Sequence, residues 1–253
     1  MSKLFSVEGK VALVTGGTSG IGHMIAKGLV EHGARTYIVG RNPESCRQVA
    51  QELSAHGDCR VLPGDLSTQA GVMAVTAQLA EQETRLDILV NNAGAMYEAP
   101  IEEFSEEGWD SIVDLNLKSV FFLTQKLLPQ LRSAASQGGQ ASVINIGSVG
   151  GLRVGPKENY SYQAAKAGLH HLSGSLAKRL GPENITVNAI APGFFISKLT
   201  HIPDEQLAAA VSMVPRRRIG QAEDMVGAVI YLASTAGSFV TGAVIPVSGG
   251  MTL

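Results

Sequence analysis

Short apolar runs alternate with helical patterns along the whole chain, and this alternation constrains the fold more than any other feature. The runs are apolar at successive positions, which is typical of strands buried on both faces of a parallel sheet. The predicted strands span Lys10–Val14, Arg35–Val39, Arg60–Leu62, Asp87–Val90, Ser142–Ile146, Ile185–Ile190 and Ala243–Val247. The predicted helices span Ile21–His32, Glu44–Ala55, Gln69–Glu81, Glu107–Arg132, Tyr160–Leu180 and Ala222–Ser234.

This order of elements predicts an α/β fold: a Rossmann-type, doubly wound parallel sheet of about seven strands with helices on both faces. The 253 residues suffice for one large domain, and no linker or repeat divides them. We therefore expect residues 1–253 to form a single dinucleotide-binding and catalytic domain. The segment at about 193–215 is longer than an ordinary connection after a strand, and we expect it to act as a lid over the carboxyl edge of the sheet.

Composition excludes several classes of function. With 45% hydrophobic residues, 17% charged residues and a formal net charge of −2, the chain has no electrostatic basis for binding nucleic acid or an anionic membrane. It has neither a membrane-length apolar run nor a signal peptide, so a cytoplasmic protein is expected. Cys46 and Cys59 lack metal-site spacing and are too few for a disulfide framework, so we expect reduced thiols and no bound metal.

A glycine-rich turn, Thr15-Gly-Gly-Thr-Ser-Gly-Ile-Gly22, joins the first predicted strand to its helix. Its glycines permit a tight turn and a close approach of backbone to a pyrophosphate, and the helix N-terminus offers unpaired N–H groups. The alternative is a turn with a purely structural role. The cofactor contacts predicted here are Gly16, Thr18, Ser19, Gly20, Ile21 and Gly22.

The end of the second predicted strand indicates which dinucleotide binds. Proteins that bind NAD usually place an acidic residue there, for the ribose 2′-hydroxyl. Here Gly40 occupies that place, and Arg41 and Asn42 follow. A guanidinium can hold a 2′-phosphate that a carboxylate would repel, so we predict NADP(H), bound by Arg41 and Asn42. The alternative is an exposed arginine in a loop.

The segment Tyr160-Ser-Tyr-Gln-Ala-Ala-Lys166 points to acid–base chemistry. Tyr162 and Lys166 are four residues apart, so they share one face of a helix. An ammonium one turn away favours the phenolate and lowers the pKa of the tyrosine. Ser148, after the apolar run VINI, is placed to hydrogen-bond a carbonyl oxygen while Tyr162 exchanges its proton. The alternative is an ordinary tyrosine and lysine on a surface helix.

Taken together, these motifs resemble the short-chain dehydrogenase/reductase family from about Gly9 to Gly250. TGGTSGIG resembles its cofactor turn, Asn91-Asn-Ala-Gly94 its NNAG segment, and Pro192-Gly193 the turn after its sixth strand. The catalytic residues that the resemblance implies are Asn116, Ser148, Tyr162 and Lys166. The further cofactor contacts that it implies are Asp65, Leu66, Asn92, Ala93, Gly94, Tyr162, Lys166, Pro192, Gly193, Phe195 and Ser197.

The family resemblance also implies a role for each catalytic residue. Tyr162 donates a proton to the carbonyl oxygen, and Ser148 positions that oxygen. Lys166 binds the nicotinamide ribose and lowers the pKa of the tyrosine, and Asn116 holds a water that links the lysine to solvent. Tyr160 has no lysine four residues on. His170 and His171, further along the same helix, are interpreted as packing or surface residues.

Within this family the chain looks most like the 3-oxoacyl-acyl-carrier-protein reductases, especially the rhamnolipid-biosynthesis type. The segments that carry this likeness are LSAHGDCRVLPGDLS, LLPQLRSAAS and TAGSFVTGAVIPVSGG. The resemblance implies NADPH-dependent reduction of a 3-oxoacyl thioester, carried by acyl carrier protein or CoA, in a homotetramer. The alternatives are an NADP-linked dehydrogenase of a sugar acid, steroid or other small ketone or alcohol, and a non-catalytic NADP sensor or scaffold. The complete set of catalytic residues argues against the sensor.

Four further features bear on the substrate. The lid residues either cover an acyl chain or pack as core: Phe194, Phe195, Leu199, Leu207, Val211 and Met213. The run Arg216–Arg218 either attracts an acidic carrier or a CoA phosphate, or pairs structurally. Glu183-Asn184 stands where related reductases often place an arginine that docks the carrier. Arg153 is a candidate contact for a substrate phosphate or carboxylate.

Overall fold

The computed structural model describes residues 3–136, 138–196 and 204–253, with the backbone alone for residues 204–207. Within these ranges seven parallel strands form one sheet in the order β3-β2-β1-β4-β5-β6-β7. The strands are β1 Val11–Thr15, β2 Arg35–Gly40, β3 Cys59–Pro63, β4 Ile88–Asn91, β5 Ala141–Ile146, β6 Ile185–Pro192 and β7 Val244–Val247. The predicted fold class is confirmed.

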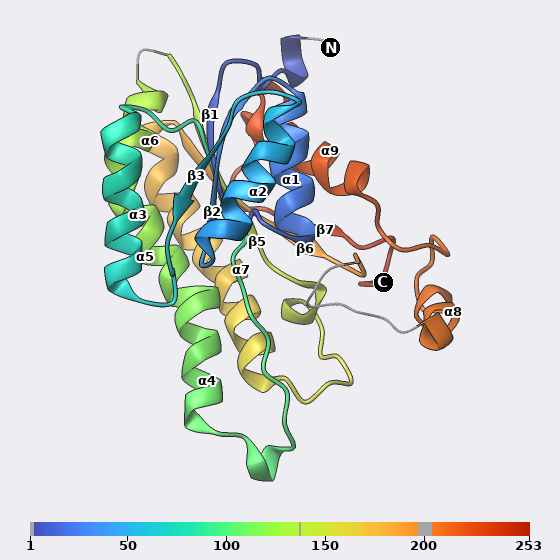
Figure 1. Ribbon diagram of the computed structural model, residues 1–253. Coiled ribbons are helices and arrows are strands. Elements are labelled where there is room, and N and C mark those ends of the chain that lie inside the picture. The colour runs from blue at the N-terminus through green and yellow to red at the C-terminus, as the bar shows by residue number, and fades with distance from the viewer. Residues whose placement is uncertain (1–2, 137, 197–203) are drawn as a thin grey trace.

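Helices cover both faces of this sheet (Figure 1). The longer ones are α1 Gly20–Glu31, α2 Pro43–Ser54, α3 Gln69–Gln82, α4 Glu106–Val113, α5 Ser119–Lys126, α6 Leu128–Ala135, α7 Tyr160–Leu180, α8 Asp204–Ser212 and α9 Ala222–Ala233. The short segments are η1 Lys3–Phe5, η2 Ile101–Glu103, η3 Asp114–Lys118, η4 Val149–Gly151, η5 Gly181–Glu183 and η6 Thr235–Gly237. α1 packs against α9 on one face, and α3 packs against α5 on the other.

Two apolar layers explain why the strands are apolar at successive positions. Along β1, Ala12 and Val14 belong to the layer that includes the buried faces of α1 and α9. Val11 and Leu13 belong to the opposite layer, with the buried faces of α3 and α5. Since successive side chains of a strand point to opposite faces, both sets are buried only when helices cover both sides of the sheet.

The predicted helix Glu107–Arg132 is divided in the structure. α4 passes into a π-helical turn, η3, and then into α5; α6 begins after Leu127. Pro129 lies in the first turn of α6, where its missing N–H leaves no helical hydrogen bond unmade. The π-helical turn contains Asn116, whose side chain bonds to another segment of the chain. Pro129 and the side-chain bonds of Asn116 account for the division, and the period of the hydrophobic residues reveals neither.

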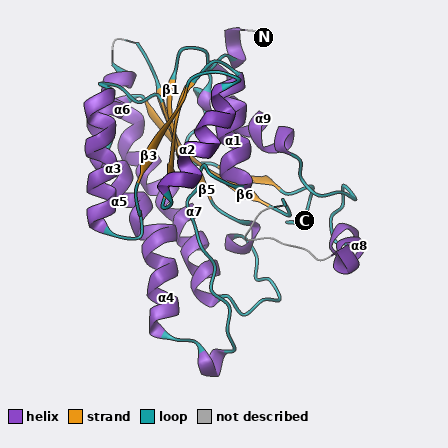
Figure 2. Cartoon of the chain, viewed as in Figure 1, coloured by secondary structure: helices purple, strands orange, loops and turns teal. Residues whose placement is uncertain are grey.

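The topology creates a crevice at the carboxyl ends of the strands. β2 and β4 pair with opposite edges of β1, so the connections after β1 and β4 leave the sheet in opposite directions. The long loops before α4 and after β5 gather at the end of the molecule opposite the N-terminus (Figure 2). In the parts of the chain that the structure describes, no helix is long and apolar enough to cross a membrane.

Candidate active site

The glycine turn after β1 brings two backbone segments into close contact. Gly16 has a φ of 65°, a conformation that a side chain disfavours. At Gly22 a Cβ would lie 2.2 Å from the Gly16 carbonyl oxygen and 2.3 Å from Asn92 Nδ2. No residue with a side chain therefore fits at position 22. The Asn92 side chain donates to the Thr15 carbonyl over 2.8 Å and ties the turn to the end of β4.

Thr15, which was not among the predicted site residues, fixes this junction. Its hydroxyl oxygen accepts from the backbone N–H groups of Asn92 and Ala93, both over 2.9 Å. The hydroxyl also donates to the Val90 carbonyl over 3.4 Å. Its position at the end of a buried strand, before the glycines, was the available signal. Thr15 thus ties the segment that begins at Asn92 to the glycine turn, at the carboxyl end of the sheet.

The first turn of α1 offers an anion cradle. Ser19 is the N-cap residue, yet its side chain makes no capping hydrogen bond. The first N–H groups of a helix have no partner inside it, and they carry positive partial charge. The cradle also contains Thr18, Gly20 and Ile21. Open donors, a free hydroxyl and glycines without room for a Cβ fit a pyrophosphate.

The end of β2 fits a 2′-phosphate better than a ribose hydroxyl alone. A Cβ at Gly40 would lie 2.8 Å from Cys46 Sγ and 2.9 Å from Thr18 Cγ2, so an acidic side chain has no room there. Arg41 is exposed and has no hydrogen-bond or ion-pair partner among the described residues. Asn42 differs from its predicted use, because its side chain accepts from the N–H groups of Glu44 and Ser45 and caps α2.

The remaining predicted cofactor contacts fall into two groups. Asp65 lies exposed after β3, where its Oδ1 accepts from the N–H and hydroxyl of Ser67, while Leu66 is buried in the core. At the end of β6, Pro192 pairs with Val247, and the Gly193 N–H donates to the Val247 carbonyl over 3.0 Å.

Phe195 is a core residue and does not cover an acyl chain. Its side chain is 2% exposed and lies where a Cβ of Gly220 would be 2.4 Å from its ring. The Gly220 N–H donates to the Phe194 carbonyl, which holds this segment against the chain before α9. Of the predicted lid, Ser197 and Leu199 lie outside the described residues, as does the side chain of Leu207. Met213 is exposed.

Ser148, Tyr162 and Lys166 come together at the carboxyl end of β5. Ser148 follows this strand and caps η4, where its Oγ accepts from the Gly150 N–H over 3.0 Å. Its side chain also lies close enough to Tyr162, in the first turn of α7, to lower the pKa of the tyrosine hydroxyl in part. Lys166 Nζ lies 5.7 Å from the centroid of the Tyr162 ring. The three predicted residues thus form one cluster.

The protonation of this cluster differs from the prediction. Burial raises the pKa of Tyr162 above its ordinary value, and the nearby Ser148 side chain only partly offsets this. Burial also lowers the pKa of Lys166 to about 8. The Lys166 Nζ donates to the Ile146 carbonyl over 2.7 Å and lies over the tyrosine ring. The predicted lowering of the tyrosine pKa is not found in this structure, because desolvation outweighs the effect of Ser148.

Asn116 acts through the backbone of a neighbouring segment. Its side chain is fully buried; Oδ1 accepts from the Ala95 N–H over 2.9 Å, and Nδ2 donates to the Ala95 carbonyl over 2.8 Å. This pair of bonds fixes the chain just after Gly94. Both ends of the carboxamide are thus engaged by Ala95, and the predicted contact with a water stays a prediction.

Three side chains near the cluster have clear partners. The Tyr160 hydroxyl donates to Glu158 Oε1 over 2.8 Å, which directs it away from a proton-transfer role. His170 is buried, but Nε2 accepts from the Ser148 N–H over 3.4 Å, so its interpretation as a mere packing or surface residue is incomplete. Arg153 donates to the Met251 carbonyl. The hypothesis that Arg153 meets a substrate anion is not supported by this contact.

Most of the candidate carrier-binding cations are paired. Arg218 forms an ion pair with Asp224 and, as the main cause, lowers the pKa of that carboxyl to about 2. Arg217 donates to the Ser212 carbonyl over 2.6 Å, whereas the Arg216 side chain makes no hydrogen bond to the described residues. Glu183 accepts from two arginines, of α6 and α7, and these bonds lower its pKa to about 2.

Comparison with known proteins agrees with this geometry. A family model described as enoyl-(acyl carrier protein) reductase matches residues 16–252. The chain is 48% identical to the rhamnolipids biosynthesis 3-oxoacyl-[acyl-carrier-protein] reductase of Pseudomonas aeruginosa, over 100% of both chains. It is 35% identical to gluconate 5-dehydrogenase of Gluconobacter oxydans, over 99% of this chain and 97% of that one.

A solved structure, the Pseudomonas aeruginosa RhlG/NADP active-site complex, superposes on the chain with a TM-score of 0.97 at 48% identity, covering 100% of each. Such similarity over the full length extends from the glycine turn to the final strand. The chain belongs to the short-chain dehydrogenase/reductase family, as its sequence motifs predicted.

Proposed function

We propose that this chain is an NADPH-dependent reductase that converts the 3-oxo group of an acyl thioester to a secondary alcohol. One observation carries the proposal: Ser148, Tyr162 and Lys166 form one cluster, in which the Lys166 ammonium lies over the tyrosine ring and Ser148 is close enough to affect the pKa of the tyrosine. Tyr162 is protonated at neutral pH, so it holds the proton that a reduction requires, and a charged Lys166 beside it stabilises the phenolate that forms. The same cluster stands at the sheet edge where the glycine turn forms its anion cradle.

The proposed roles follow from the positions of the polar atoms. When bound, NADPH supplies the hydride that reduces the carbonyl carbon. Tyr162 gives its hydroxyl proton to the carbonyl oxygen, and Ser148, which lies beside Tyr162, donates to the same oxygen and orients it. Lys166 in its charged form binds the ribose hydroxyls and stabilises the phenolate that remains. The Asn116 carbonyl holds a water through which the lysine regains a proton.

The choice of NADPH rests on residues of this chain. Arg41 is an exposed cation without a partner among the described residues, and Gly40 has no room for the carboxylate typical of NAD binding. The Gly16–Gly22 turn and the N-terminus of α1 would hold the pyrophosphate. The NADP complex of a structure 48% identical to this chain supports the same assignment.

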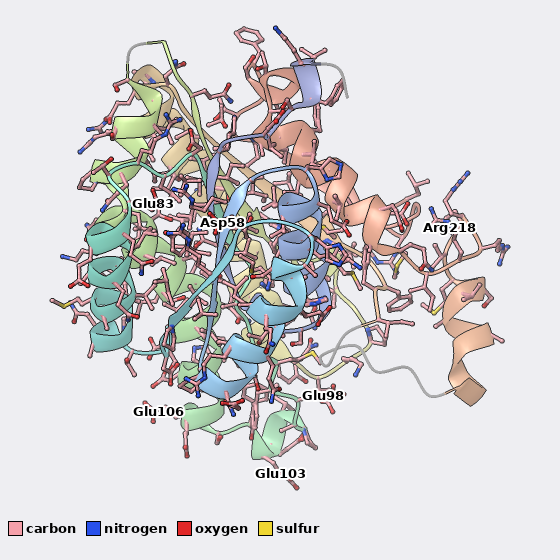
Figure 3. The ribbon with its side chains drawn as sticks, turned by 45° about the horizontal axis from the view of Figure 1, so that its top comes forward. Asp58, Glu83, Glu98, Glu103, Glu106 and Arg218 are labelled. Carbon is pink, nitrogen blue, oxygen red and sulfur yellow. The ribbon has the colours of Figure 1, made fainter. Side chains whose placement is uncertain are left out.

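The thioester substrate is supported by the relatives and restricted by surface charge. The P. aeruginosa relative is a 3-oxoacyl-[acyl-carrier-protein] reductase. On this chain, however, an acidic surface borders the loop between Ser148 and Tyr162, and Figure 3 shows part of it where α4 projects. It comprises Glu98, Glu102, Glu103, Glu106, Glu107 and Asp110. We infer that an anionic carrier, whether protein or CoA, approaches from the lid side, where Arg216 stands.

A second candidate is an NADP-linked dehydrogenase of a sugar acid. Two observations favour it: the 35% identity to gluconate 5-dehydrogenase, and the engagement of Arg132 and Arg179 by Glu183. Cations that are held by an internal carboxylate are less available to an acidic carrier protein. A small anion that needs no docking surface would be unaffected.

An NADPH-oxidation assay at 340 nm separates these proposals. The substrates are 3-oxoacyl thioesters of increasing chain length, each on both carrier protein and CoA, with 5-ketogluconate and cyclic ketones alongside. We expect the highest kcat/KM with a 3-oxoacyl thioester. Preference for 5-ketogluconate would favour the second candidate. Inactivity throughout, with intact NADPH binding, would favour a sensor.

We also propose that the chain forms a homotetramer. The outer faces of α5 and α7 form an apolar groove of about 400 Å³ whose lining includes Leu117, Phe121, Phe122 and Leu172. Apolar grooves of this kind are typical of surfaces that bind another chain. Light scattering coupled to size-exclusion chromatography tests this directly. A monomer at micromolar concentration would rule the tetramer out.

A further inference from the structure

His170 lies one helical turn beyond Lys166 on α7, beneath the turn that carries Ser148. Its side chain is 8% exposed. Two glycines make room for the imidazole: a Cβ at Gly147 would lie 2.1 Å from Nε2, and a Cβ at Gly151 would lie 2.9 Å from Cε1. The ring therefore occupies space that these two positions leave open on either side of Ser148.

The imidazole holds the turn through a single nitrogen. The Ser148 N–H donates to Nε2, so the neutral ring carries its proton on Nδ1. Nδ1 is buried and has no hydrogen-bond partner among the described residues. Ser148 is held on its other side by Gly150, whose N–H donates to Oγ. The backbone and the hydroxyl of Ser148 thus depend on different partners.

We propose that His170 is a positioning residue for the reaction: its neutral imidazole holds the Ser148 backbone so that the hydroxyl meets the substrate oxygen and Tyr162. This inference rests on the proposed function, because it takes from it the role of Ser148. A protonated His170 turns an N–H toward the Ser148 N–H. Two donors then face each other, and the turn has to move.

The charges around the ring favour the neutral form. Burial lowers the pKa of His170; the Gly151 backbone raises it in part, and the Lys166 ammonium lowers it. Tyr162 is the other titratable group on this face of α7, and it is neutral. From the turn, Gly147, Ser148 and Gly151 meet the ring without a charge. The loss of activity that comes from His170 should therefore lie on the acid side, where the imidazole gains its proton.

The test compares kcat between about pH 5 and pH 8 for His170→Gln, His170→Leu and a control, His56→Leu. His56 is an exposed histidine in the turn after α2, and it does not line the groove between α5 and α7. For His170→Leu we expect kcat to fall about tenfold at neutral pH, because Ser148 loses its acceptor, with NADPH affinity unchanged. His170→Gln retains an acceptor that does not titrate, so it should recover most of the turnover and lose the acid limb.

A second measurement is independent of turnover. In protein labelled with nitrogen-15 at serine, the Ser148 amide signal should titrate with pH in the parent and in His56→Leu, but not in His170→Gln. An unchanged acid limb in His170→Gln, or a Ser148 amide that titrates equally there, would overturn the positioning role. Inactivity of the parent toward every thioester overturns the proposed function instead and leaves the amide titration to decide on His170.

Discussion

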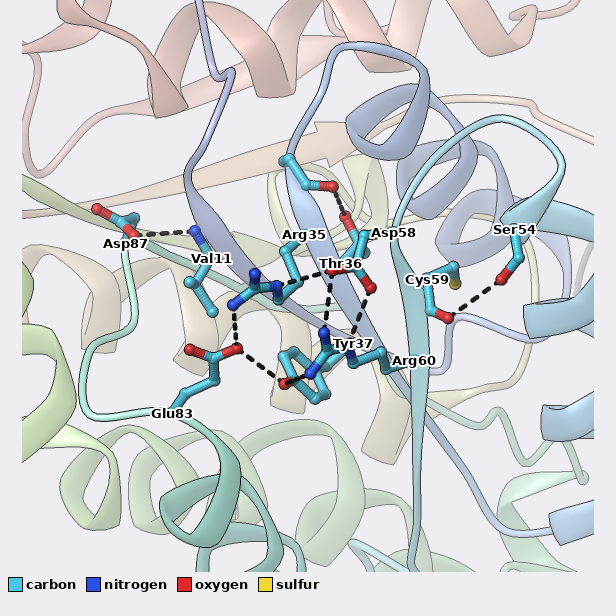
Figure 4. A network of polar contacts seen from close by, with 11 residues as sticks. Val11, Arg35, Thr36, Tyr37, Ser54, Asp58, Cys59, Arg60, Glu83 and Asp87 are labelled. Carbon is cyan, nitrogen blue, oxygen red and sulfur yellow. Dashed lines mark hydrogen bonds and ion pairs between the residues drawn. The ribbon is translucent and has the colours of Figure 1, made fainter.

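The two ends of the parallel sheet differ in whether the charged side chains of the network and of the site are paired. At the amino end, charged side chains from successive strands pair with one another (Figure 4). Arg35 donates to Asp58 over 2.8 Å and to Glu83 over 2.9 Å, and the Tyr37 hydroxyl donates to the same oxygen of Glu83. Arg60 also donates to Asp58 over 2.9 Å and lies over the Tyr37 ring.

At the carboxyl end, the cations of the proposed site, Lys166 and Arg41, have no partner of opposite charge among the described residues. Lys166 is buried against a carbonyl, and Arg41 is exposed without a partner among the described residues. Ser19 caps α1 without a side-chain bond. The paired end can only stabilise the fold, whereas the unpaired end holds groups ready for a ligand at some cost in stability. Substitutions at the two ends should therefore separate stability from activity.

The largest effect should come from Tyr162→Phe at the carboxyl end. Removal of the proton donor should lower kcat about 10³-fold, since the Phe ring packs alike but has no proton to give. NADPH affinity and the melting temperature should stay close to those of the parent. Stopped-flow NADPH oxidation measures kcat, fluorescence titration measures NADPH affinity, and thermal unfolding measures the melting temperature. Tyr160→Phe is the matched control, because its hydroxyl bonds Glu158; equal losses in the two variants would contradict the assignment.

Lys166→Met should stabilise the ligand-free fold while it removes activity. The folded-state pKa of Lys166, about 8, lies below the ordinary 10.5, so the unfolded chain binds more protons between these values. Parent stability therefore increases from pH 8 to pH 10.5, and the full penalty is present below pH 8. Burial of the charged Lys166 costs the parent about 3 kcal/mol of unfolding free energy below pH 8, and Lys166→Met removes this cost. The variant loses about 1 kcal/mol, because the Ile146 carbonyl no longer accepts a hydrogen bond from Lys166.

We thus expect Lys166→Met to gain about 2 kcal/mol at pH 7 and to lose about 1 kcal/mol above pH 10.5, where the desolvation penalty has vanished and only the lost hydrogen bond to the Ile146 carbonyl remains. Urea unfolding at a series of pH values measures both. A variant less stable than the parent at pH 7 would show that Lys166 is a structural residue, and the contrast between the two sheet ends would then fail.

Sequence patterns were sufficient where function depends on local chemistry. The strands, the glycine turn and the Tyr162–Lys166 spacing are each contained in a few neighbouring residues, and the fold and family that they predicted are confirmed. The catalytic roles of Ser148 and Asn116 remain predictions, although the structure places Ser148 at Tyr162. Local sequence patterns were therefore enough to place the candidate site at the carboxyl end of the sheet.

The amino-end network and the contacts beneath the site needed the three-dimensional structure. Arg35 and Glu83 are 48 residues apart in sequence, and no pattern around either predicts their contact. The contact between His170 and Ser148 joins two elements and depends on small residues at positions 147 and 151. Phe195 lies in an apolar segment, as both a lid residue and a core residue would, so only its burial in the structure shows that it belongs to the core.

Arg41→Asp tests whether the unpaired cation selects the cofactor. The change removes charge-assisted hydrogen bonds to a 2′-phosphate and adds repulsion, so the NADPH to NADH ratio of kcat/KM should fall about thirtyfold. Turnover at saturating cofactor should hardly change. Arg47→Ala is the matched control, because Arg47 is exposed on α2 and pairs with Glu44. An unchanged ratio in Arg41→Asp would contradict the NADP assignment.

The smallest effect should come from Glu83→Gln at the amino end, and it should affect stability alone. Glu83 is buried and accepts from both Arg35 and Tyr37, and glutamine keeps the shape while it removes the charge. Because Arg35 is partly exposed, the loss should be about 1 kcal/mol rather than that of a fully buried pair. Urea unfolding of Glu83→Gln, compared with that of Glu81→Gln, an exposed neighbour on α3, isolates the stability that the buried carboxylate contributes.

The kcat of Glu83→Gln should equal that of the parent, since the network and the catalytic cluster lie at opposite ends of the strands. A loss of kcat without a loss of stability would mean that the two ends are coupled through the sheet.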